Sequence, residues 1–76
     1  MTTAARHKNK IVVTYPSQTP VTLNAIALAD SKNYGAMVIT ELIKAWGQSF
    51  VRGLIYLDEI TGIFQGIKEC LAEEGE

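Results

Sequence analysis

Few residues of this 76-residue chain have types and spacings that support catalysis. Asp58 and Glu59 are two carboxylates of the kind used in acid–base catalysis, but neighbours in a helix point apart and we expect both to be solvated. His7 has no identifiable partner, and Cys70 is better explained as a buried thiol than as a nucleophile. The sequence also lacks a glycine-rich phosphate loop, a catalytic triad and metal-ligand spacing. We therefore expect a protein without a cofactor that is not an enzyme.

Length and composition predict a protein that associates with itself. A chain this short buries only about 60% of its unfolded surface, and its single cysteine cannot form an internal disulfide. The hydrophobic content of 47% and the mean hydropathy of +0.10 are high for such a chain. Both values predict a homodimer that covers apolar surface. No run reaches the ~18 apolar residues of a membrane span and the N-terminus is polar, so we expect a cytoplasmic protein without a membrane partner.

Charge is divided unevenly along the chain. Residues 1–34 hold four basic side chains and one acidic side chain, a net +3, whereas residues 35–76 hold three basic and seven acidic ones, a net −4. The overall net charge of −1 argues at first against a nucleic-acid partner. The uneven distribution changes that interpretation, because it indicates different surroundings for the two halves.

One short strand is predicted near the N-terminus. Residues 1–9 lack apolar periodicity and are expected to form a flexible basic arm. The segment Lys10-Ile-Val-Val-Thr-Tyr-Pro16 is rich in β-branched and aromatic residues, and Pro16 ends it because proline cannot donate to a ladder. Alternation places three of its side chains on one outward face. They are Lys10, Val12 and Thr14.

Three helices are predicted after the strand. Thr19-Pro20 is a typical helix start, and the first helix should run to about Asp30. A turn then leads to Asn33, the expected N-cap of a second helix from Tyr34 to Arg52. A third, amphipathic helix is expected from about Leu54 to Leu71. Because the first helix is uncharged, we expect the apolar face of the third to pack over it. The aromatic residues at helical spacings, which we interpret as core, are Trp46, Tyr56 and Phe64.

A lone strand has no neighbour for its backbone groups, and pairing with a second copy would supply one. The chain resembles the ribbon-helix-helix family of MetJ-, Arc- and CopG-type repressors in four features. They are the strand, the capped first helix, the four-residue turn and the pattern from Ala36 to Trp46. The resemblance covers about residues 8–50. It implies a mostly α homodimer with one short strand per chain, in which residues 10–53 form the DNA-binding core and residues 54–76 add a C-terminal helix with an acidic tail.

The resemblance also implies the contacts with double-stranded DNA. The outward residues of the family's two-stranded ribbon enter the major groove, and here they are Lys10, Val12 and Thr14. Lysine can donate to guanine O6 and N7, threonine can bond either purine edge, and valine can pack on a thymine methyl. The family holds a phosphate at the start of its second helix. The expected phosphate contacts are Asn33, Tyr34 and Gly35 there, with Arg6 and Lys8 in the arm.

The function expected from these residues is a dimeric, sequence-specific transcriptional repressor in a prokaryotic cell. A plasmid-partition protein that binds a centromere would use the same contacts. The alternative from a different class is a protein-interaction module, such as an antitoxin or an adaptor, that docks through the C-terminal helix. That helix could also join dimers into a higher oligomer.

Overall fold

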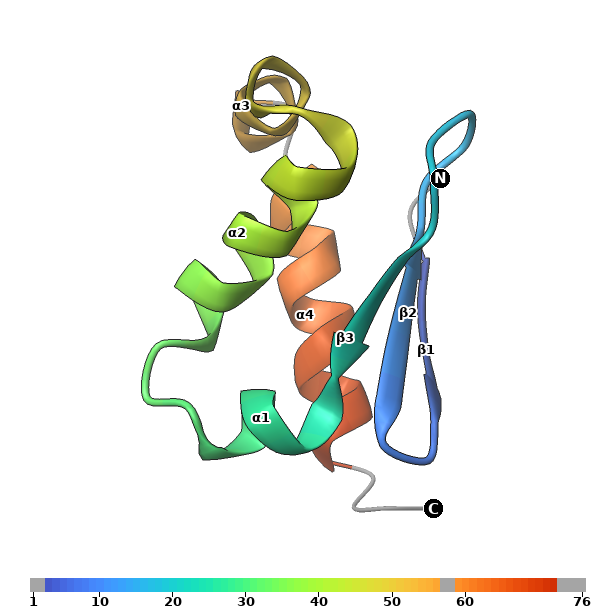
Figure 1. The fold of residues 1–76 in the computed structure, drawn as a ribbon, viewed down its shortest axis with the longest axis vertical. Helices are drawn as coiled ribbons and strands as arrows, with labels where there is room; N and C mark the ends of the chain where they lie inside the picture. The colour runs from blue at the N-terminus through green and yellow to red at the C-terminus, as the bar shows by residue number, and fades with distance from the viewer. Residues whose placement is uncertain (1–2, 57–58, 73–76) are drawn as a thin grey trace.

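The computed structural model describes residues 3–56 and 59–72, which form a sheet packed on four helices (Figure 1). Leu57, Asp58 and the acidic tail from residue 73 lie outside the described residues. The sheet lies on one side of the molecule and the helices on the other. The elements in chain order are β1 (Thr3–His7), β2 (Lys10–Thr14), β3 (Val21–Asn24), α1 (Ala25–Asp30), α2 (Tyr34–Trp46), α3 (Gln48–Tyr56) and α4 (Glu59–Ala72).

The three strands form one antiparallel sheet in the order β1-β2-β3. The predicted fold class, a mostly α chain with one short strand in a ribbon-helix-helix dimer, is therefore wrong. The predicted strand exists as β2, but it is central, with Val12 opposite Ala5 of β1 and Thr22 of β3. Both of its edges are occupied by strands of the same chain, so β2 cannot form a two-stranded ribbon with its own copy.

Two of the strands lie where the sequence predicted other structures. Residues 3–7 belong to the expected flexible arm, but they form β1 and join β2 through a hairpin whose loop residue Lys8 has a φ of 58°. The first helix was expected from Thr19-Pro20, yet residues 21–24 form β3 because Val-Thr-Leu-Asn alternates apolar and polar side chains. The helix begins only at Ala25, where the Asn24 side chain accepts a hydrogen bond from the N–H of Ala27 at 3.0 Å.

Gly47 divides the predicted second helix into α2 and α3. Its φ of 93° and ψ of 149° lie outside the helical region, while its N–H still donates to the Ile43 carbonyl at 2.9 Å. Its carbonyl accepts from the N–H of Val51 at 3.2 Å, so the same residue ends one helix and begins the next. The predicted N-cap of α2 is confirmed, because the Asn33 side chain accepts a hydrogen bond from the N–H of Ala36.

The core lies between the inner face of the sheet and the helices. The inner side chains of β2 and β3 are fully or almost fully buried against residues of α1, α2, α3 and α4. The core residues of the strands are Ile11, Val13, Val21 and Leu23, and the larger ones of the helices are Leu28, Val38, Leu42, Trp46, Val51, Ile63 and Ile67.

The C-terminal helix packs mainly on β1 and α3, not over the first helix as predicted. Its buried side chains are Ile63, Ile67 and Cys70, which confirms the predicted amphipathic face and the buried thiol. Gly66 lets α4 approach the sheet closely, because a Cβ at this position would lie 3.3 Å from the Cβ of Ala4. In residues 3–56 and 59–72, no helix has both the length and the apolar character that crossing a membrane requires.

Candidate nucleic-acid interface

The outer face of the sheet is the surface on which the three predicted base-contacting side chains gather. The described helices all lie on the inner side (Figure 1), and seven of the eight outward side chains are exposed. We call this surface the open face. Its residues are Thr3, Ala5, His7, Lys10, Val12, Thr14, Thr22 and Asn24.

The three predicted base-contacting residues share the open face. Lys10 is exposed at the hairpin end of β2, and Thr14 is exposed at the other end, where its hydroxyl lies 3.1 Å from the hydroxyl of Thr3. Val12 lies between them and is half-buried by its cross-strand neighbours. The predicted alternation of side chains is therefore confirmed, although it occurs in a three-stranded sheet and not in a ribbon between two chains.

The sheet carries positive charge without compensating carboxylates. Residues 3–24 contain Arg6, Lys8 and Lys10 and no aspartate or glutamate. Lys8 and Lys10 lie at or next to the tip of the hairpin, with His7 opposite Lys10 on the open face. The end of the sheet at this hairpin therefore combines flexible basic donors with the hydroxyl and amide groups of the neighbouring strands.

Arg6 has a different position from the other basic residues. It pairs with Ile11 in the register, so its side chain starts on the inner face. Its Nε donates to the carbonyl of Lys8 at 2.7 Å, and its Nη1 donates to the carbonyl of Cys70 at 2.9 Å. Arg6 thus holds the hairpin against the end of α4, where a cation also interacts favourably with the helix dipole.

The expected phosphate site at the start of α2 does not lie on the open face. Asn33 uses its side chain to cap α2, and the Tyr34 ring packs edge-on against Phe64, with ring centroids 6.1 Å apart. A Cβ added at Gly35 would also contact the Phe64 ring. The segment between α1 and α2 lies on the helical side of the molecule (Figure 1). The structure therefore does not bring this predicted phosphate site together with the predicted base contacts.

The open face also includes side chains that sequence reasoning missed. Thr22 and Asn24 come from β3 and stand beside Val12 and Lys10 in the register. Threonine and asparagine both donate and accept hydrogen bonds, so they extend the polar row of β2 by a second strand. The alternation of apolar and polar residues in Val21-Thr-Leu-Asn24 could have predicted this strand. The apparent helix start at Thr19-Pro20 favoured a helix instead.

Within the described ranges, no three histidine, cysteine, aspartate or glutamate side chains lie close enough together to hold a metal ion. Searches against protein-family models, curated proteins and solved structures gave no match to this chain. The interpretation of the open face therefore depends on its own geometry and charge.

Proposed function

We propose that this protein binds double-stranded DNA through the open face and regulates transcription as a repressor. The observation that supports the proposal is a sheet face left uncovered by the described helices, with Lys10 on it, Lys8 in the adjoining hairpin loop, and no carboxylate in residues 3–24. Phosphates attract such a surface without regard to sequence, while side chains that reach base edges provide discrimination.

The dimensions of the sheet suit the major groove. Neighbouring strands lie about 4.8 Å apart, so β2 and β3 form a two-stranded ribbon about 5 Å wide between its axes. The major groove is about 12 Å wide and admits a two-stranded β-ribbon. In the proposed complex, Lys10 donates to guanine, Thr14 bonds a purine edge, and Val12 contacts a thymine methyl. Asn24 adds a side chain of the type that bonds adenine N6 and N7.

A duplex fits the open face better than a single strand does. Proteins that bind single strands stack the bases on aromatic side chains, each worth about 1–3 kcal/mol. The open face has no phenylalanine, tyrosine or tryptophan. The large aromatic side chains Tyr15, Trp46 and Phe50 instead contact one another at ring-centroid distances of 5.3 to 5.8 Å.

The proposal includes a homodimer. One copy offers only Lys8, Lys10 and His7 near the hairpin for contact with phosphates, and affinity for DNA increases with the number of phosphates neutralised. Two copies double that number. Docking through the C-terminal helix, the alternative function, has less support because Ile63, Ile67 and Cys70 already pack in the chain's own core.

Binding to duplex DNA from the region flanking the protein's own coding sequence tests the proposal. Lys10→Ala should lower affinity for a specific duplex by about 1–3 kcal/mol, roughly five- to 150-fold, while a scrambled duplex is affected less. Lys68→Ala, which removes an exposed lysine from α4, is the matched control and should bind as the unchanged protein does. Fluorescence anisotropy across a salt series measures both variants.

Two results would contradict the proposal. One is the absence of any binding to duplex DNA at about 50 mM salt, where phosphate contacts are strong. The other is an equal loss of affinity for Lys10→Ala and Lys68→Ala, because it would show a diffuse charge effect without a role for the open face.

A further inference from the structure

The two edges of the sheet differ in how well they are covered. At β1, α4 packs closely through Gly66, and the Cys70 Sγ lies 3.8 Å from the carbonyl oxygen of Ala4 as a weak donor. At β3, the described residues place β2 on one side and no strand on the other. An open strand edge is a ready template for another strand.

The register shows which backbone groups of β3 point to that open edge. The N–H of Ala25 donates to the carbonyl of Asn9 at 2.8 Å, which continues the β2–β3 register by one step. In an antiparallel pair, hydrogen-bonded and non-hydrogen-bonded positions alternate. Val21 and Leu23 therefore bond to β2, and the N–H and C=O of Thr22 point away from it.

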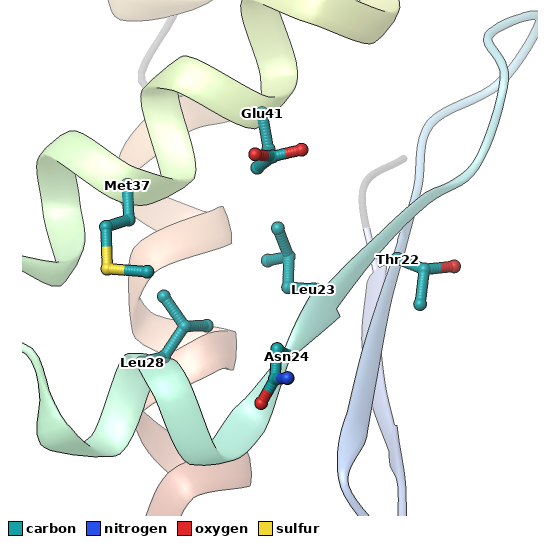
Figure 2. A pocket seen from close by; sticks show the side chains of 6 residues that line it. All are labelled: Thr22, Leu23, Asn24, Leu28, Met37 and Glu41. Carbon is teal, nitrogen blue, oxygen red and sulfur yellow. The ribbon is translucent and has the colours of Figure 1, made fainter.

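A hollow of about 260 Å³ adjoins the same edge, between β3 and α2. Figure 2 shows Leu28 and Met37 pointing toward one another there, with Leu23 also on the helical side and Thr22 pointing away from the helices. A second hollow continues along α2 beside Met37 and Thr40. Met37 is 38% exposed and is one of two large hydrophobic side chains identified as exposed in the described residues. Glu41 also lines both hollows, so the open edge is bordered by a mixed surface on which Met37 is the exposed apolar side chain.

We propose that a second copy of this chain binds at this edge, with β3 pairing antiparallel to the partner's β3 about a two-fold axis at Thr22. The N–H and C=O of each Thr22 would exchange two hydrogen bonds with the same groups of the partner's Thr22. The two three-stranded sheets become one, and the two open faces become continuous. This inference rests on the homodimer of the proposed function and gives that homodimer its interface.

The strand itself supplies the argument for a second copy as the occupant. A two-fold pair keeps both alternations in phase, so the partner's Val21 comes opposite Leu23 on the inner side and the partner's Thr22 comes opposite Thr22 on the outer side. β3 carries no charged residue, although exposed edges are commonly protected by charges. Strand pairing over four residues covers little surface, so the proposed dimer would also bury Met37 and the hollow beside it.

Sedimentation velocity of the full chain without DNA, over a concentration series, tests this interface. The unchanged protein should sediment with twice the mass of the 8.3 kDa chain. Thr22→Lys places two like charges directly opposite one another across the axis and should raise the dimer dissociation constant by up to about fivefold. Thr14→Lys puts the same charge on the open face away from this edge and should leave the dimer intact.

A charge-reversal pair makes the test specific. Thr22→Glu alone should also weaken the dimer, whereas an equimolar mixture of Thr22→Glu and Thr22→Lys should form a heterodimer, because opposite charges meet across the axis. Circular dichroism of each variant confirms that Thr22, which is exposed, tolerates the changes.

The inference is overturned if the unchanged protein stays monomeric at millimolar concentration, because β3 would then not pair with the β3 of a second copy. It is also overturned if Thr22→Lys and Thr14→Lys weaken the dimer equally, or if the mixture does not restore association. DNA binding by a monomer would refute the homodimer and its interface but not DNA binding through the open face, and a dimer without DNA affinity would refute the DNA-binding function alone.

Discussion

The replacement Gly47→Ala tests the backbone conformation that separates α2 from α3. At φ 93° and ψ 149°, Gly47 occupies a region that is close to exclusive to glycine. An added Cβ would meet nothing within 4 Å, so the cost of the replacement comes from the backbone and not from a clash with neighbours. The flanking residues Trp46 and Val51 are both buried in the core, and this packing opposes an easy relaxation of the junction into a continuous helix.

The expected destabilisation follows from that single residue. Holding a non-glycine residue in a sparsely populated backbone region costs about 1–3 kcal/mol. For a domain of this size, each 1 kcal/mol shifts the melting temperature by about 4–8 °C. Gly47→Ala should therefore lower the melting temperature by about 8–16 °C for a mid-range cost of about 2 kcal/mol.

Gly53→Ala is the matched control for this measurement. Gly53 lies inside α3, its added Cβ would also meet open space, and its φ is not in the left-handed region. Alanine in a helix interior is more stable than glycine by about 0.5–1 kcal/mol, so this variant should melt at a higher temperature. Thermal unfolding followed by circular dichroism should thus give shifts of opposite sign. Shifts of the same sign, or no loss in Gly47→Ala, would refute the reasoning about the helix junction.

Two further replacements test single side-chain hydrogen bonds by urea unfolding. Arg6→Gln should lower the free energy of unfolding by about 1–2 kcal/mol, because the carbonyls of Lys8 and Cys70 lose a charged donor. Arg52→Gln, at an exposed position of α3, should change it little, and equal losses in both variants would exclude a specific role for Arg6. Trp46→Phe should cost about 1 kcal/mol or more, because the indole N–H that donates to the Thr19 carbonyl at 2.6 Å is lost. An unchanged urea midpoint would show that this bond does not stabilise the loop before β3.

The elements with strong local patterns were predictable from the sequence. The alternation in Ile11 to Thr14 located β2 and the orientation of its side chains, and the amphipathic spacing that includes Ile63 and Ile67 located most of α4. The N-cap at Asn33 was predictable because an asparagine side chain can accept a hydrogen bond from a free backbone N–H in the first turn of a helix. These features depend on neighbours within a few residues along the chain.

The features that were mispredicted depend on partners distant in sequence or on one backbone angle. β1 has the weak strand sequence Thr-Ala-Ala-Arg-His, and it is a strand because β2 and α4 cover it. β3 follows an apparent helix start, and only its pairing with β2 decides its conformation. The positive φ at Gly47 could not be predicted from the hydrophobic pattern, because that pattern continues across Gly47 without a break. The predicted base-contacting residues were placed together on one face, but the residues contributed by β1 and β3 could not be found without these strands.

The contact between β1 and α4 has a consequence for synthesis of the protein in the cell. The strand and the helix are far apart in the sequence, and the hydrogen bond from Arg6 to Cys70 joins them across 64 positions. Ribosomes add residues at about 5–20 per second, and early parts of a chain emerge first. The first strand must therefore wait for the last helix to leave the exit tunnel before its apolar side is covered. A chain that stopped before α4 would leave this side of the sheet exposed, so β1 and β2 are expected to reach their final packing only after α4 has been synthesised.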